Sequence, residues 1–228
     1  MKTVSSTDGA VFYFILKLNN GGNILLYRTK STMKIFIIIT VVLAVIFIIA
    51  QAFVMSSTNK TESHAYTVVK DFGSFEIRQY EPALFTSVAM QAASYKSVSS
   101  QGFRTLAGYI FGDNDRSQKI AMTSPVAMTM DDSVTMRFKV PEGMAMDDLP
   151  KPNNRKIRFE EQPAKTMAAI QFGGWSTDER IAEYTEKLKA LLAENNIPYT
   201  GEFNYFGYNP PYELVNRKNE IAVEVVLQ

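Results

Sequence analysis

Two stretches of this sequence echo one another: EIRQYEPALFTSVAM at Glu76–Met90 and IRFEEQPAKTMAAIQ at Ile157–Gln171. Each alternates apolar with polar residues, reaches a proline-containing turn at Pro82 or Pro163, and then continues into a second alternating segment. This is the pattern of two strands joined by a turn. We therefore expect the folded part of the chain to contain two copies of one unit.

A helix is predicted after each pair of strands. In the first copy, apolar residues spaced by three and four run through 95–111, and Gly112 is a typical helix stop. In the second copy, Ser176 is a suitable N-cap, Glu179 completes a capping box, and the Asn-Asn pair at Asn195 ends the helix. Both helices carry a buried stripe, so each is expected to pack on a sheet.

Two further strands close each copy, at 119–130 and 133–140 in the first and at 199–208 and 220–227 in the second. The unit is therefore strand, strand, helix, strand, strand, used twice. The predicted fold class is α+β, a largely antiparallel curved sheet that carries two helices.

An apolar run, IFIIITVVLAVIFIIA, occupies Ile35–Ala50, and apolar residues continue to Met55. As a helix this segment is about 32 Å long, enough for a hydrocarbon core of about 30 Å. Residues 34–55 are therefore predicted to be a transmembrane anchor. A second interpretation is a signal peptide that begins at Met33 and is cleaved after the small-x-small site at Ala50–Ala52.

Charge predicts the orientation of this segment. Five cations and one acid, Asp8, precede the apolar run, whereas Lys60 and Lys70 after it are offset by acids. The positive-inside rule then places residues 1–33 in the cytoplasm and the C-terminal part of the chain on the other side of the membrane. Residues 1–33 are alternatively a non-native extension. Residues 56–64 read as a polar linker and 65–228 as the folded domain. The expected localisation is a single-pass membrane protein with an extracytoplasmic domain.

Composition excludes several classes of function. The chain has no cysteine and one histidine, His64, so thiolate sites and multi-histidine metal centres are not expected within one chain. A net charge of +1 gives no field for binding nucleic acid. Sequence motifs of hydrolases, metalloproteases and nucleotide-binding loops are absent. We expect no catalytic residues, and we interpret His64 as a solvated histidine in the linker.

Methionines and aromatic residues gather in the middle and late parts of the chain. Met122 and Met128 pack a core or line an adaptable apolar pocket. Phe103 lies on the first predicted helix and Tyr208 on the late strand FNYFGYNPPY. Such rings suit a flat macrocycle, and Arg104 offers a cation for its carboxylates. For each aromatic residue alone, core packing is the simpler interpretation.

The segment KIAMTSPVAM, Lys119–Met128, is similar to the signature of the SOUL heme-binding family. SFEIRQYEPALF, GFRTLAGYIFGDN, FGYNPP and RKNEIAVEV resemble that family too, in the family's order. The resemblance extends over about 66–227. It implies a duplicated unit that forms a distorted antiparallel β-barrel with two helices.

The resemblance also implies a site and a cofactor. Heme binding in an apolar groove beside the first helix would involve Phe103, Leu106 and Ala107, together with Tyr208 on the late strand. Ser100 stands where one branch of the family has an arginine near the heme carboxylates. Gln79 stands where another branch has a proposed axial histidine, and an amide is a poor ligand for iron.

The predicted function is a membrane-anchored, non-catalytic binding protein for heme or a related tetrapyrrole, held mainly by apolar burial. The alternative is an envelope scaffold or sensor domain that binds another amphipathic small molecule.

Overall fold

The computed structural model of the chain describes residues 30–91, 95–130 and 134–226. The chain divides between Ile49 and Ala50 into two units. Helix α1, Lys30–Lys60, begins in the first unit and ends in the second. It is long and apolar enough to cross a membrane, and its large apolar side chains are exposed. The helix continues to Lys60, through part of the segment that we expected to be a linker, because Ser, Thr and Asn lower helix propensity only modestly.

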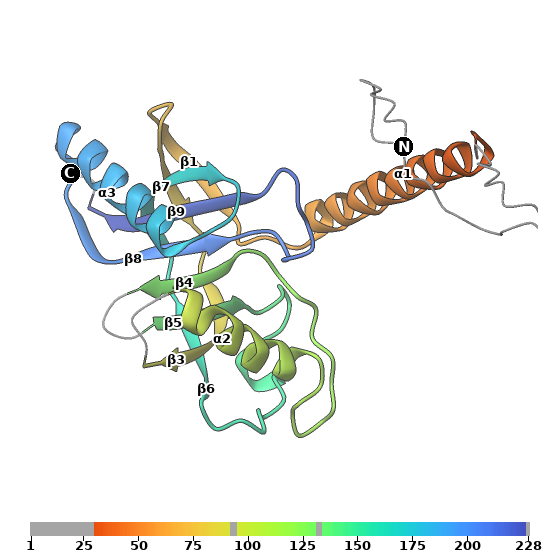
Figure 1. Cartoon of the computed structure of the whole chain (residues 1–228). Helices are drawn as coiled ribbons and strands as arrows, with labels where there is room; N and C mark the ends of the chain where they lie inside the picture. Colours follow the sequence, from red (N-terminus) through yellow and green to blue (C-terminus); the bar gives the residue numbers. More distant parts are fainter. Residues whose placement is uncertain (1–29, 92–94, 131–133, 227–228) are drawn as a thin grey trace, which may run out of the picture. The chain divides into compact units, whose positions relative to one another are not determined.

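The second unit is α+β, as predicted (Figure 1). After α1, its elements follow in the order β1 (Tyr66–Asp71), β2 (Glu76–Tyr80), β3 (Ala83–Met90), α2 (Tyr95–Ile110), β4 (Val126–Met130), β5 (Val134–Lys139), a short 3-10 helix (Met146–Asp148), β6 (Ile157–Gln162), β7 (Lys165–Gly173), α3 (Asp178–Glu194), β8 (Tyr199–Gly207) and β9 (Lys218–Val225).

The described strands form one curled antiparallel sheet in the order β1-β2-β7-β9-β8-β4-β5-β3-β6. The duplication is visible in this order, because β2-β7-β9-β8 mirrors β6-β3-β5-β4. The first strand of each copy is exchanged: β2 pairs with β7 of the second copy, and β6 pairs with β3 of the first. The predicted duplicated antiparallel barrel is thus confirmed, in the form of a half-barrel.

The strands β2 and β3 do not form a hairpin, and Pro82 lies in the connection between them. Pro82 has no backbone N–H, and a proline holds the residue before it, here Glu81, in an extended conformation. An extended conformation at Glu81 is compatible with the observed path, in which β3 continues into the other half of the sheet and pairs with β5 and β6. Pro163 occupies the equivalent place between β6 and β7.

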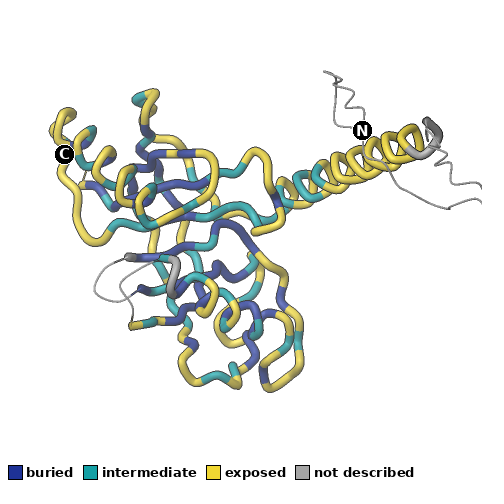
Figure 2. The backbone as a smooth tube through the Cα atoms, in the orientation of Figure 1, coloured by how far each residue is buried: buried dark blue, intermediate teal, exposed yellow. Residues whose placement is uncertain are grey.

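Alternation along the strands separates two faces. On β9, Ile221 and Val223 lie in the main hydrophobic core, which includes α2 and α3 residues, whereas Ala222 lies in a second, smaller cluster. The same alternation on β4 places Met128 in the main core and Ala127 in the second cluster. We call the face without helices the open face. Figure 2 shows buried residues along the strands of both halves.

Two local predictions were wrong. The N-cap of α3 is Thr177, whose Oγ1 accepts a hydrogen bond from the Arg180 N–H at 3.3 Å. Ser176 instead donates to Asn219 Oδ1 at 2.8 Å, so tertiary contacts use its hydroxyl. The strand predicted from Lys119 begins only at Val126. Predictions for residues 1–29 fall outside the described residues.

Candidate functional site

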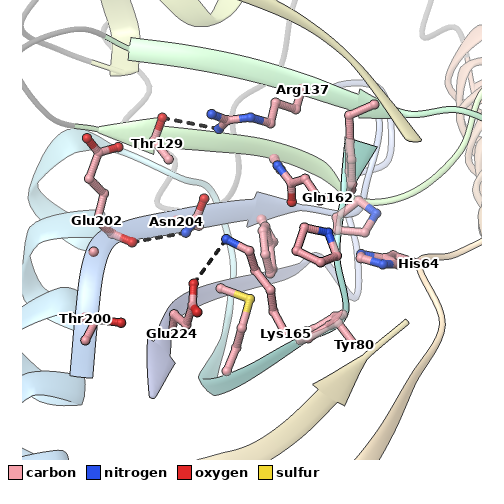
Figure 3. A pocket seen from close by; sticks show the side chains of 17 residues that line it. His64, Tyr80, Thr129, Arg137, Gln162, Lys165, Thr200, Glu202, Asn204 and Glu224 are labelled. Atoms are coloured by element: carbon pink, nitrogen blue, oxygen red, sulfur yellow. Dashed lines mark hydrogen bonds and ion pairs between the residues drawn. The ribbon is translucent and has the colours of Figure 1, made fainter. Parts of the chain in front are cut away.

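A cavity of about 350 Å³ opens on the open face, between strands of both copies (Figure 3). A small side chain leaves room for it. Ala127 on β4 lies in register between Arg137 on β5 and Phe206 on β8, so a methyl group separates two large side chains. Thr129 and Asn204 form the next register pair on this face of the sheet and also line the cavity.

One wall of the cavity is aromatic and apolar. Tyr80 and Phe206 meet edge to face with ring centroids 6.2 Å apart, and both rings are buried. Met167 on β7 and Phe85 on β3 extend this wall. The four side chains come from four different strands, which the exchange of β2 brings together. A wall of this kind suits the face of a flat apolar ring.

His64 also lines the cavity, although the sequence indicated a solvated linker histidine. Its backbone N–H donates to Ser124 O at 2.9 Å, and its Nε2 donates to Glu81 O at 2.7 Å. The imidazole contacts Tyr80 and Phe85, with ring centroids 5.1 and 5.5 Å away. Burial lowers the pKa of His64 below its ordinary value, so the neutral ring is favoured. The residues after α1 therefore fold back onto the sheet.

Two cations reach the cavity from opposite sides. Arg137 Nε pairs with Glu160 at 3.0 Å, and its Nη1 donates to Thr129 Oγ1 at 3.4 Å. Lys165 Nζ pairs with Glu224 at 3.1 Å. Both cations are partly exposed, so they can exchange these partners for the acidic groups of a ligand.

A buried polar network lies beside the cavity on the same face. Arg78 Nη1 and Nη2 donate to the two oxygens of Glu220 at 2.9 and 3.1 Å, and Arg78 Nη1 also donates to Tyr80 OH at 3.1 Å. Tyr208 OH donates to Glu220 at 2.6 Å. Burial would raise the pKa of Glu220, but Arg78 overcomes this and lowers it, so the carboxylate stays ionised. The network fixes the position of Tyr80.

The structure does not bring the predicted site residues together. Phe103 is partly buried in the main core, 5.4 Å from Phe138 between ring centroids. Leu106 and Ala107 are buried in that core at 0% and 7% exposure. Tyr208 packs against the second cluster instead, on the other face of the sheet.

The remaining predicted residues are also separate from the cavity. Arg104 is exposed on α2, and Met122 is partly exposed before β4. Tyr208 lines a second, polar cleft of about 430 Å³. Gln79 accepts a hydrogen bond from Thr166 at 2.6 Å and lines neither cavity. The cavity residues were missed although their alternation with core residues along β4 and β8 was a usable signal.

Comparison with known proteins agrees with this architecture. The model of the SOUL heme-binding protein family matches residues 61–224. Human heme-binding protein 2 is 30% identical over 158 residues, which are 65% of this chain and 77% of that protein. Heme-binding protein 1 of Xenopus laevis is 28% identical over 160 residues, 67% of this chain and 84% of that protein.

A solved structure shares the fold. The C-terminal domain of EcmrR superposes with a TM-score of 0.54 at 12% identity, covering 72% of this chain and 99% of that domain. This likeness shows the fold alone. The family match covers most of the chain and nearly all of the second unit beyond α1. The chain belongs to the SOUL heme-binding protein family.

Proposed function

We propose that this chain is a non-catalytic binding protein for heme or a related tetrapyrrole, and that the ligand lies in the cavity of the open face. The observation that carries the proposal is the pairing of an aromatic wall with two cations in one cavity. Tyr80 and Phe206 offer apolar ring faces, while Arg137 and Lys165 offer charge for carboxylates. Family membership supports the class of ligand.

The residues fit the ring and the carboxylates of heme better than they fit its iron. The iron of heme is held by the porphyrin nitrogens and takes only one or two axial ligands from a protein. His64 is beside the cavity, but its Nε2 is bonded to Glu81 O. Bound heme would supply a flat apolar surface and two acidic groups, and these do not depend on the metal. We therefore expect comparable micromolar affinities for iron and iron-free porphyrins.

The groove beside α2 is the competing location. Phe103, Leu106 and Ala107 were predicted there, together with Arg104, Met122 and Tyr208. Leu106 and Ala107 are packed in the main core, so a ring could enter only if α2 moved off the sheet. The open-face cavity of about 350 Å³ is present without any movement of α2, and we favour it for that reason.

We further propose that α1 is retained as a single-pass anchor, with its N-terminus in the cytoplasm and the domain outside it. The exposed apolar surface of α1 and the excess of cations before it support this orientation. The helix continues through Ala50–Ala52 without a break, so the suggested cleavage site has no extended backbone.

A titration tests the proposed ligand. The full chain in detergent is titrated with hemin and with iron-free protoporphyrin IX, and binding is followed in the Soret band. We expect saturable binding of both, and about tenfold weaker binding of both by Phe206→Ala. The matched variant Phe103→Ala should bind like the wild type. A strict requirement for iron would contradict the proposal.

A different amphipathic ligand would give a different result. In one such result, neither porphyrin gives saturable binding, while a hydrophobic fluorescent probe binds the wild type and binds Phe206→Ala more weakly. The cavity would then belong to a scaffold or sensor domain. Loss of porphyrin binding in Phe103→Ala alone would move the site to the α2 groove.

A further inference from the structure

The connection between β8 and β9 exposes three large apolar or aromatic side chains. Tyr212, Leu214 and Val215 are 64%, 47% and 51% exposed. Between them, Glu213 is buried at 1% exposure, so the backbone turns its one acid inward and the apolar side chains outward. We call residues 209–217 the β8–β9 loop. Single exposed apolar side chains are common, but three within four residues of one loop are a candidate contact surface.

The β8–β9 loop is attached to the end of α1, within the second unit. The amide of Gln51 bridges its backbone: Nε2 donates to Tyr212 O at 3.2 Å, and Oε1 accepts from the Leu214 N–H at 3.0 Å. Two turns further along α1, Thr58 Oγ1 donates to Glu213 Oε2 at 2.7 Å. The acid that would oppose contact with lipid is therefore held on the helix.

Further contacts make the β8–β9 loop a defined shape. The guanidinium of Arg217 donates to three loop carbonyls, those of Asn209, Pro210 and Glu213, at 2.7 to 3.3 Å. The same guanidinium lies 4.3 Å from the ring centre of Trp175, which is 52% exposed. The loop therefore presents its apolar residues without needing to refold.

The position of Gln51 on α1 determines how deep the β8–β9 loop lies relative to the proposed bilayer. It follows directly after the apolar run Ile35–Ala50, and apolar residues continue past it to Met55. If α1 spans a bilayer with residues 34–55, Gln51 lies about one helical turn before the end of the span, near the boundary between acyl chains and head groups. Residues bonded to Gln51 lie at that same depth, where tyrosine and leucine side chains are stabilised by the interface.

We propose that Tyr212, Leu214 and Val215 insert into the outer head-group region of the membrane that α1 crosses. This contact would give the domain a second attachment and a fixed orientation toward the bilayer. The proposal rests on the membrane anchor proposed above and not on the identity of the ligand. The occupant of this surface is lipid of the same bilayer.

Tryptophan placed in the β8–β9 loop tests this contact. The chain has one tryptophan, so Trp175→Phe gives a silent background. In that background the full chain carries Leu214→Trp and is reconstituted in phosphatidylcholine vesicles. We expect a blue-shifted emission compared with detergent-free unfolded protein, and strong quenching by lipids brominated high in the acyl chain.

The control places tryptophan at Tyr199, at the end of β8 that is far from the β8–β9 loop. Tyr199 is 42% exposed and begins β8, about 25 Å of strand away from the loop. Tyr199→Trp in the same background should emit at longer wavelength and resist the brominated lipids. Equal quenching at both positions, or none at Leu214→Trp, would overturn the proposal.

Vesicle flotation separates this failure from failure of the anchor. If the chain floats with vesicles but Leu214→Trp is not quenched, the anchor stands and the loop contact is wrong. If the chain does not float, both are wrong. Porphyrin titration of the same samples reports on the proposed ligand independently, because the loop residues do not line the cavity.

Discussion

Arg78 on β2 and Glu220 on β9 form a bidentate ion pair across the intervening strand β7, with N–O distances of 2.9 and 3.1 Å. Their side chains are 4% and 0% exposed. The small side chain of Ala169, buried on the same face of β7, leaves room for this crossing. Because β2 comes from the first copy and β9 from the second, the pair secures the strand exchange.

Removal of one partner of this pair should be strongly destabilising. Glu220→Gln removes the bidentate carboxylate from the buried guanidinium of Arg78, which keeps only the partly exposed Glu76, 2.7 Å from its Nε. We expect the free energy of unfolding to fall by about 3 kcal/mol, the lower end of the cost of breaking a buried ion pair. Replacing both residues, as Arg78→Met with Glu220→Leu, should recover most of that loss. Urea unfolding of the three proteins measures the difference, and a double variant as unstable as the single one would contradict this account.

His64 should make the domain less stable in mild acid. Burial lowers its folded-state pKa below the ordinary value of 6.5, so the stability that it contributes is present above about pH 6.5 and is lost as the pH falls through that range. Unfolding measured at pH 7.5 and 5.5 should show a decrease for the wild type and a smaller one for His64→Gln. An equal decrease in both would place the sensitivity elsewhere.

Gly102 is where α2 approaches the sheet. A Cβ at this position would lie 2.6 Å from the terminal methyl of Met90 and 3.2 Å from that of Met136. Both methyls end flexible side chains, so Gly102→Ala should be near neutral, with the gain in helix propensity offsetting the shift. Gly102→Val should lower the free energy of unfolding by about 1–3 kcal/mol through overpacking. Thermal unfolding distinguishes the two.

The repeat at Glu76 and Ile157 predicted the class of fold because alternation and proline turns are local signals. The exchange of β2 was not predictable in this way, since a turn at Pro82 is compatible with a hairpin and with a continued strand. Ser176 looked like a cap in isolation, but Asn219, far away in sequence, takes its hydroxyl.

The lining of the cavity was harder to predict than the fold. Phe103 and Phe206 look alike in sequence, and only the sheet shows that one belongs to the main core and the other to the cavity wall. His64 joins the cavity through backbone contacts with Ser124 that no motif encodes. Residues from four strands form the wall, so their proximity depends on strand order, which a single sequence does not contain.

The central claim is that a tetrapyrrole lies in the open-face cavity, and charge reversal tests it most directly. Lys165 is a partly exposed cation at the cavity, and Arg104 is an exposed cation beside the α2 groove. Neither substitution should unfold the protein, because partly exposed ion pairs contribute little.

Protoporphyrin IX is therefore titrated into full-length wild type, Lys165→Glu and Arg104→Glu under the same conditions. We expect Lys165→Glu to raise the Kd about tenfold, which is about 1.4 kcal/mol, and Arg104→Glu to leave it unchanged. An unchanged Kd in Lys165→Glu with weakened binding in Arg104→Glu would contradict the account and place the ligand beside α2.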